Sequence, residues 1–217
     1  MPPKRPISEA TVERLPLYLR SLQDLARAEQ STVSSDRLAE MAGVNAAKVR
    51  KDLSYFGSYG TRGVGYDIEY LLLHIRRELG LTHDWQCVIA GMGNLGQALA
   101  NYGGFRDRGF VVGALVDSDP MKVGRPVGDL VIDHIDRLDE LVARLGLRIG
   151  IVATPGDAAQ EVADRMVAAG IGSILNFAPV VLVVPTEILV RKVDLATELQ
   201  ILSFYEERSE QSSSTRS

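Results

Sequence analysis

The stretch "VIAGMGNLGQALA", residues 88–100, decides the expected architecture of the second half of the chain. Gly91, Gly93 and Gly96 form the pattern G-x-G-x-x-G, directly after an apolar run and at the start of a helix-forming segment. In that context the glycines permit a tight turn, close approach of the backbone to a pyrophosphate, and close packing of helix against strand. The stretch therefore predicts a dinucleotide-binding turn. The alternative is a turn whose glycines serve packing alone.

The segments around this turn alternate between strand-like and helix-like patterns. The expected strands are 85–90, 109–117, 129–133, 148–154, 173–178, 180–185 and 188–194. The expected helices run from the glycine turn to about residue 108 and over 156–170. Strands and helices that alternate at this length indicate a parallel sheet covered on both faces. The predicted fold class is therefore α/β, with a Rossmann-type parallel sheet domain over residues 85–193.

The second predicted strand ends at Asp117, about twenty residues after the last glycine of the turn. A carboxylate there can accept hydrogen bonds from both hydroxyls of a ribose and would repel a 2′-phosphate. Backbone N–H groups at the start of the helix after the turn can receive the phosphates. The pattern thus favours NAD(H) over NADP(H) as the cofactor.

A different pattern fills the N-terminal part of the chain. Residues 1–7 contain three prolines and are expected to form a disordered arm, and a helical apolar repeat begins at Ser8. Ser34 or Ser35 can cap a short helix that ends at Gly43, and Asn45 can cap the next one. These segments predict a helix-turn-helix. The glycine-rich run 57–68 predicts a hairpin wing, so that a winged-helix domain covers 8–80 and a linker covers 81–84.

Basic residues cluster on the second helix of that motif. A helix that enters a DNA major groove needs donors to base edges and phosphates on one face. Arg62 between glycines could reach a minor groove, and tyrosines can donate to phosphates. The residues predicted to contact DNA are Asn45, Lys48, Arg50, Lys51, Tyr55, Tyr59 and Arg62. The alternative is a solvated charged helix face.

Bulk composition excludes several other classes. The net charge of −4 gives no overall nucleic-acid signal, so DNA binding must rest on a local patch. The single cysteine, Cys87, excludes an intrachain disulfide and a Cys-based zinc site, and its apolar surroundings predict a buried thiol. The first residues lack the apolar stretch of a signal peptide, and no run has the length of a membrane span. We expect a cytoplasmic protein without metal.

A dehydrogenase would also need a proton donor near the nicotinamide. Of the three histidines, His74 falls in the helix before the domain boundary, His83 falls in the boundary, and His134 has no evident partner in sequence. Little chain remains for a substrate domain. The cofactor is therefore expected to be bound rather than used, and the protein is not expected to be an enzyme. An NAD-dependent dehydrogenase with a fused DNA-binding domain remains an alternative. A CoA- or nucleotide-binding interaction protein without DNA binding is a third reading.

The last predicted helix, 194–208, has apolar residues at Leu195, Leu199, Leu202 and Phe204. Its apolar face has no evident place in the sheet of its own monomer, so exchange with a partner subunit is expected. Residues 209–217 are rich in serine and are expected to form a disordered tail.

At this point the motifs match a known family. The segments "VNAAKVRKDLSYFGSYGTRGVGYD", "GMGNLGQALANYGGF", "ILNFAPV" and "VDLATELQIL" closely resemble the Rex redox-sensing transcriptional repressors. The resemblance implies a winged-helix domain that binds palindromic operators, and a Rossmann domain that senses the NADH/NAD⁺ ratio. It further implies a homodimer with a swapped C-terminal helix. NADH would weaken operator binding and derepress genes of respiration and NADH reoxidation.

The resemblance also implies particular residues. A switch would use Arg20, Tyr102 and Asp194, with the aspartate exchanging partners between the other two according to redox state. The turn Ala153–Pro155 and the segment Asn176–Pro179 would lie near the nicotinamide. The implied cofactor contacts are Gly91, Met92, Gly93, Asn94, Leu95, Gly96, Asp117, Thr154, Pro155, Asn176, Phe177, Ala178 and Pro179.

Overall fold

The structure is a computed structural model that describes residues 7–57, 60–61 and 64–214. The chain divides into two compact units, Met1–His83 and Asp84–Ser217, and their boundary falls inside the segment expected to be a linker, 81–84. We refer to them as the first and second unit. Two residues predicted to contact DNA, Tyr59 and Arg62, lie outside the described residues.

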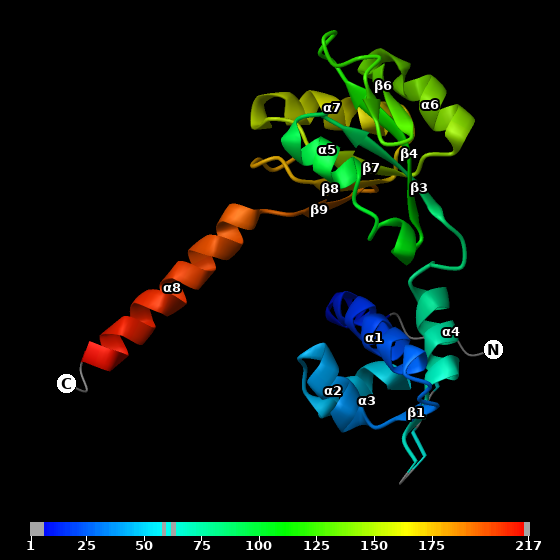
Figure 1. Cartoon of the computed structure of the whole chain (residues 1–217), viewed down its shortest axis with the longest axis vertical. Helices are drawn as coiled ribbons and strands as arrows, with labels where there is room; N and C mark the ends of the chain where they lie inside the picture. The colour runs from blue at the N-terminus through cyan, green and yellow to red at the C-terminus, as the bar shows by residue number, and fades with distance from the viewer. Residues whose placement is uncertain (1–6, 58–59, 62–63, 215–217) are drawn as a thin grey trace. The chain divides into compact units, whose positions relative to one another are not determined.

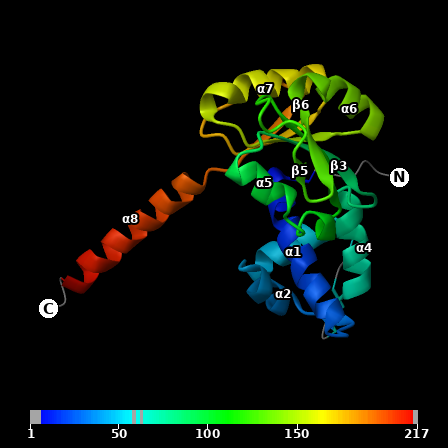
Figure 2. The same cartoon turned by 45° about the horizontal axis from the view of Figure 1, so that its top comes forward.

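The first unit is a small helical domain (Figure 1). Its elements are α1 (Glu9–Arg27), β1 (Thr32–Val33), α2 (Ser35–Ala42), α3 (Ala46–Ser54), β2 (Tyr66–Asp67) and α4 (Ile68–Glu78). Helix α1 begins at the cap Ser8, whose side chain accepts from Thr11 N, and it continues through Pro16. Helices α1 and α4 lie side by side (Figures 1 and 2). Apolar side chains from all four helices share one core.

The glycine-rich run forms a tight hairpin turn, followed by a strand that pairs outside the run. Strand β2 pairs antiparallel with β1, so that Tyr66 lies opposite Val33 and Asp67 opposite Thr32. Within the glycine-rich run, Thr61 and Gly65 form an isolated antiparallel bridge. Reciprocal backbone hydrogen bonds, Thr61 N to Gly65 O and Gly65 N to Thr61 O, both at 2.9 Å, close this turn. Strand β2, which follows it, pairs with the short segment between α1 and α2.

The second unit contains the predicted parallel sheet. Its strands are β3 (Trp85–Ala90), β4 (Phe110–Asp117), β5 (Pro126–Val127), β6 (Leu130–His134), β7 (Ile149–Val152), β8 (Ser173–Asn176) and β9 (Leu189–Lys192). Their order in the sheet is β5-β6-β4-β3-β7-β8-β9, and only the β5–β6 pair is antiparallel. Apart from β5, this is the order of the doubly wound dinucleotide-binding fold, which reverses its winding between β3 and β7. The predicted fold class is confirmed.

Helices cover both faces of this sheet (Figure 1). Helix α5 (Asn94–Ala100) lies over one face, on a core that includes Ile89, Leu115 and Ile151. Helices α6 (Leu138–Leu145) and α7 (Gly156–Ala168) cover the other face, on a core that includes Val88 and Val116. Alternate residues of the central strands thus point to opposite helical layers.

Two expectations for this unit are wrong in detail, and two elements were missed. The apolar run 180–185 is not a strand, because the Gln160 amide takes the place of a neighbouring strand: its Nε2 donates to Val183 O at 2.8 Å and its Oε1 accepts from Val183 N at 2.9 Å. The helix after the glycine turn ends at Ala100, and only a short 3-10 turn, Arg106–Arg108, follows it. Helix α6 and strand β5 were not predicted.

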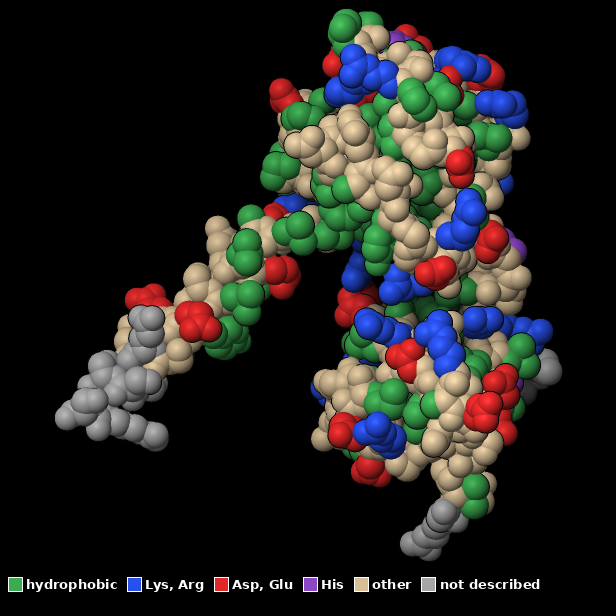
Figure 3. All heavy atoms as spheres, viewed as in Figure 1, with side chains coloured by type: hydrophobic (Ala, Val, Ile, Leu, Met, Phe, Trp, Pro, Cys, Tyr) green, Lys and Arg blue, Asp and Glu red, His purple; other side chains and the backbone are tan. Residues whose placement is uncertain are grey.

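The last helix, α8 (Leu195–Ser214), is longer than expected. It continues past Arg208, so residues 209–214 are helical rather than part of a disordered tail. Every residue of α8 whose burial the structure describes is exposed, including Leu199, Leu202 and Phe204. Figure 3 shows apolar side chains along the surface of this helix. Across the described residues, no helix combines the length and the apolar character needed to cross a membrane.

Candidate functional site

The glycine turn lies at the carboxyl end of β3, next to the point where the winding of the sheet reverses. Gly91 has φ +95°, and a Cβ there would lie 2.7 Å from both Ala153 O and Thr154 Cγ2. A Cβ on Gly96 would lie 1.9 Å from Gly91 O. Side chains at these two positions are therefore excluded, and the turn packs directly on the turn that follows β7.

The carboxylate of Asp117 holds this turn in place. Asp117 ends β4 and is 7% exposed; its Oδ2 accepts from Met92 N at 2.7 Å and from Lys122 Nζ at 3.0 Å, and its Oδ1 accepts from Asp119 N at 2.8 Å. Burial raises the pKa of Asp117, but these hydrogen bonds outweigh burial and the net pKa is lowered. The group is thus a carboxylate at neutral pH.

These contacts limit what Asp117 can offer a ribose. A carboxylate has about four acceptor positions, and three are already used within the chain. Its charge is also countered by Lys122, a residue that no motif in the sequence indicated. A ribose that reached this carboxylate would therefore meet an Asp117–Lys122 pair rather than an isolated acid, and Asp117 as the ribose acid stays a prediction.

The turn after β7 contributes an unpaired hydroxyl. Thr154 Oγ1 is buried and has no hydrogen-bond partner among the described residues, although its methyl lies against the glycine turn. A buried polar atom without a hydrogen-bond partner costs free energy, so this hydroxyl suits a ligand that offers a hydrogen-bond donor or acceptor. Helix α7 starts just after it, following Pro155. The residues here fit a dinucleotide.

The segment after β8 is used mainly for its own structure. Asn176 Nδ2 donates to Val180 O at 2.9 Å and Asn176 Oδ1 accepts from Ala178 N at 2.9 Å, so this amide closes its own turn. Asn176 and Ala178 are both 1% exposed. Pro179 lies against Gly156 at the start of α7. Phe177 and Pro179 are more exposed to solvent than Asn176 and Ala178.

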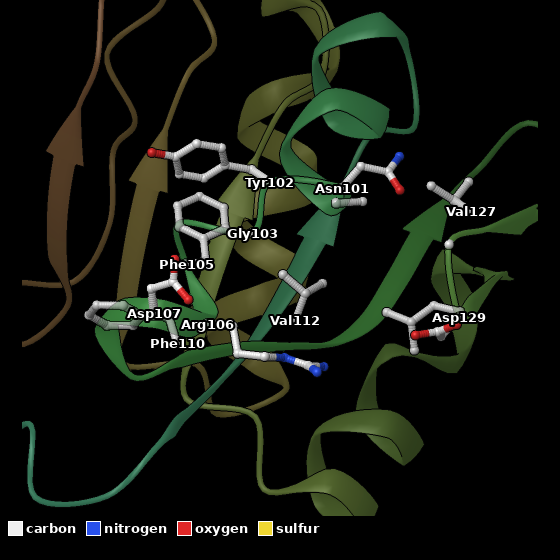
Figure 4. Close-up of a pocket in the computed structure, with 13 residues that line it drawn as sticks. Asn101, Tyr102, Gly103, Phe105, Arg106, Asp107, Phe110, Val112, Val127 and Asp129 are labelled. Carbon is white, nitrogen blue, oxygen red and sulfur yellow. The ribbon is translucent and has the colours of Figure 1, made fainter.

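Tyr102 lies at a separate hollow of about 380 Å³ on the α5 side of the sheet (Figure 4). Its ring packs edge-on against Phe105, and its hydroxyl accepts from Arg108 Nη1 at 3.3 Å. Arg106, Asp107 and Asp129 also line this hollow, so its wall is mixed polar and apolar. Tyr102 is half exposed and available for other partners.

The other two predicted switch residues have contacts of their own. Asp194 caps α8 by accepting from Thr197 N at 3.1 Å, and it pairs with Lys192 Nζ at 2.9 Å. The hydrogen bond from Lys192 is the first of the causes that lower the pKa of Asp194. Arg20 is an exposed residue of α1.

The helix-turn-helix has the predicted caps. Ser34 Oγ accepts from Arg37 N at the start of α2, Gly43 ends that helix with φ +66°, and Asn45 Oδ1 accepts from Ala47 N at 2.7 Å at the start of α3. Asn45 therefore serves as a cap, and its side-chain oxygen is occupied. Tyr55 is the C-terminal cap of α3 and is half-buried.

The basic residues of α3 are exposed, as expected for a DNA-contacting helix. Lys48, Arg50 and Lys51 all face solvent. Arg50 Nη1 donates to Ser35 Oγ at 2.9 Å, and both residues line a hollow of about 310 Å³ that Thr61 of the wing also borders. One part of the predicted nucleic-acid surface is thus preformed.

Other groups have no evident ligand role. Cys87 is 2% exposed, and burial raises the pKa of its thiol to about 11, as expected for a structural cysteine. His134 pairs with Asp136 at the surface. Within the described part of the chain, no group of three or more His, Cys, Asp or Glu residues could hold a metal ion.

Comparisons with known proteins give a separate family match for each of the two units. Residues 6–54 match the family model described as "Putative DNA-binding protein N-terminus", and residues 82–180 match the model described as "CoA binding domain". Over 204 residues the chain is 62% identical to the redox-sensing transcriptional repressor Rex of Streptomyces avermitilis, covering 94% of this chain and 81% of that protein.

Solved structures extend the similarity over nearly the whole chain. RSP, a Rex-family repressor, in complex with beta-NAD⁺ and operator DNA gives a TM-score of 0.88 at 36% identity, covering 98% of each chain. RSP in complex with beta-NADH gives a TM-score of 0.84 at 36% identity, covering 97% of this chain and 99% of RSP. Relatives named as repressors do not favour the dehydrogenase alternative. The chain belongs to the Rex family of redox-sensing transcriptional repressors.

Proposed function

We propose that this protein binds palindromic operator DNA as a homodimer in the cytoplasm and releases it when NADH replaces NAD⁺. The observation that carries the proposal is the combination of a helix-turn-helix unit with a dinucleotide-type glycine turn in a Rex-family chain. Solved complexes of RSP with NAD⁺ and operator DNA and with NADH support it. The controlled genes would serve respiration and NADH reoxidation.

NAD(H) would bind at the carboxyl ends of β3, β4 and β7. The backbone of Gly91–Gly96 would donate hydrogen bonds to the pyrophosphate, and the Asp117–Lys122 pair would receive the adenosine ribose. Thr154 Oγ1 would hydrogen-bond the nicotinamide end, because burial has left it without a partner. Phe177 and Pro179 would border the ring.

DNA would be read by α3. Arg50 and Lys51 would reach base edges or phosphates, with Lys48 and Tyr55 as further phosphate contacts. Tyr59 and Arg62, outside the described residues, would act from the wing.

The exposed apolar face of α8 supports a partner subunit that covers it. A ligand can shift an equilibrium only through different affinities for its two states. Exchange of Asp194 between Arg20 and Tyr102 would supply that difference, in place of the Lys192 contact. By linkage, operator DNA must then weaken NADH binding by the same factor.

One titration tests the function. NADH is expected to release the protein from a selected palindrome in a mobility-shift experiment, whereas NAD⁺ at equal concentration releases much less. Operator affinity that stays constant across the NADH titration would overturn the sensor function while leaving DNA binding intact.

Asp194→Ala is expected to uncouple the two sites. The variant loses both the Lys192 pair and the α8 cap, and the cap costs about 1 kcal/mol, so the protein stays folded. Its operator affinity should no longer depend on the NADH/NAD⁺ ratio, whereas the wild type should change by roughly tenfold. Thr197→Ala keeps the carboxylate and serves as the control. Regulation retained in Asp194→Ala would contradict the switch.

Lys122→Met is expected to widen the preference for NADH over NADPH by about tenfold, because it leaves the Asp117 charge unopposed near the 2′ position. The measurement is the ratio of the two affinities, obtained by competition of ADP and 2′-phosphorylated ADP against NADH. Arg125→Met removes a charge from the same loop without touching Asp117 and should leave the ratio unchanged. An equal change in both variants would exclude the pair as the ribose site.

A further inference from the structure

The buried carboxylate of Asp52 joins two helices of the first unit. Asp52 lies on the buried side of α3, with Val49 and Leu53, and is 0% exposed. Its Oδ1 accepts from Thr11 Oγ1 and from Arg14 Nη2, both at 2.9 Å. Its Oδ2 accepts from Arg14 Nε at 2.7 Å and from Tyr18 Oη at 2.8 Å. We call these four residues the Asp52 cluster. All four acceptor positions of the carboxylate are filled.

The three donors come from one stripe of α1. Thr11, Arg14 and Tyr18 are three and four residues apart, a spacing that places them on the same helix face. Tyr18 and Thr11 are buried, and the Arg14 side chain is 22% exposed. The cluster is therefore a charged junction between α1 and α3 inside an otherwise apolar core.

The carboxylate stays ionised at neutral pH. Burial raises the pKa of Asp52, but the hydrogen bonds from Arg14, Tyr18 and Thr11 outweigh burial, so its net pKa lies below the usual value. A lowered folded pKa contributes stability above the unfolded pKa of about 4, and that stability is lost as the pH falls through the folded value. The cluster is thus intact throughout the physiological range.

Stability alone gives little reason for such a cluster. A buried ion pair is often no more stabilising than apolar side chains of the same volume. What it adds is direction: the hydrophobic effect is non-directional, whereas a bidentate arginine–carboxylate pair fixes the relative geometry of its partners. Val49 and Leu53 bury the same side of α3 but would tolerate small rotations of the helix.

Rotation of α3 would move its solvent face. With helical spacing, Ala47, Arg50, Lys51 and Ser54 lie on the side opposite Asp52, Val49 and Leu53. A rotation of about 10° shifts a side-chain tip some 6 Å from the axis by roughly 1 Å. That shift spoils a base-edge hydrogen bond, which needs a donor–acceptor distance within a few tenths of an ångström.

We propose that the Asp52 cluster positions α3 for sequence-specific DNA reading by fixing the rotation of this helix against α1. The inference rests on the proposed DNA-binding function and adds its positioning residues. Phosphate contacts tolerate small displacements better than base contacts do, because they depend mainly on charge. Loss of the cluster should therefore lower operator affinity and spare non-specific affinity.

The test is the ratio of operator affinity to non-specific affinity in Asp52→Asn, with folding followed by circular dichroism. Operator affinity is expected to fall about tenfold, whereas affinity for an unrelated duplex and for NADH stays within twofold. Thr11→Val and Tyr18→Phe remove one donor each and should have smaller effects in the same direction. If Asp52→Asn does not fold, Arg14→Lys gives the same test, because it keeps the charge but loses the bidentate geometry.

Ile75→Val is the matched control. It destabilises the same core by about 1 kcal/mol without touching the cluster. An unchanged ratio in the Asp52 and Arg14 variants, or an equal fall in Ile75→Val, would overturn the positioning role while the proposed function stands. A wild-type protein that fails to prefer its operator would overturn both.

Discussion

Gly93→Ala is expected to lower NADH affinity about 100-fold or more while the protein keeps its fold. A Cβ at Gly93 would meet no atom of the chain within 4 Å, and the backbone there (φ −78°, ψ −166°) suits alanine. The free energy of unfolding should therefore stay the same or rise by less than about 1 kcal/mol. That open space is where a pyrophosphate approaches the second glycine of the motif.

The size of the effect follows from the hydrogen bonds lost. Hydrogen bonds to a charged group contribute about 1.5–3 kcal/mol each, and displacing the pyrophosphate would lose about two of them. A loss of roughly 3–6 kcal/mol corresponds to 100-fold or more in affinity. Fluorescence or calorimetric titration with NADH measures it, and operator binding in the absence of nucleotide should remain.

Gly172→Ala is the matched control. A Cβ at Gly172 also meets nothing within 4 Å. This residue directly precedes β8, so it lies at the amino ends of the parallel strands, whereas the glycine turn lies at their carboxyl ends. Gly96→Ala is unsuitable as a probe, because its Cβ would lie 1.9 Å from Gly91 O and disturb the fold itself. NADH affinity within threefold of wild type in Gly93→Ala would mean that the dinucleotide does not cross this turn.

The glycine turn and its acid could be predicted because their signals are local. A strand, three spaced glycines and an acid at the end of the next strand determine where each group lies in the fold. Helix caps such as Ser34 and Asn45 are local in the same way. Lys122 gave no such signal, because a lysine in a surface loop looks solvated until the fold brings it to Asp117.

The run 180–185 shows why an apolar pattern can mislead. Val181 and Val183 are 81% and 78% exposed, so their apolar character does not mark a buried strand. The amide of Gln160, some twenty residues earlier in the chain, satisfies the backbone of Val183 instead. Apolar periodicity cannot predict that a distant side chain, rather than a neighbouring strand, will hydrogen-bond the backbone of such a run.

Asp52 falls between these cases. Val49 and Leu53 mark the buried face of α3, and helical spacing places Asp52 on that face, so a buried carboxylate could have been expected. Its partners could not, because Arg14 comes from a helix 38 residues away. The sequence thus identifies the unusual residue but not the contacts that stabilise it.

Replacing Lys48, Arg50 and Lys51 together by alanine is expected to have the largest effect on DNA binding. Each phosphate neutralised contributes about 0.9 to the slope of log affinity against log salt. If all three side chains contact phosphate, the slope should become shallower by about 2.7 for each bound subunit, and operator affinity at about 0.1 M salt should fall by at least 100-fold. The measurement is operator affinity across a salt series.

A second triple variant separates local contact from bulk charge. Arg27, Arg76 and Arg77 belong to the last turns of α1 and α4 in the same unit, so their replacement by alanine changes the net charge equally away from α3. That variant should keep most of the salt slope, because counterion release depends on phosphates actually contacted. NADH affinity should stay near wild type in both. Equal losses of DNA affinity would mean that the basic residues of α3 act only through net charge, and α3 would then not be the reading helix.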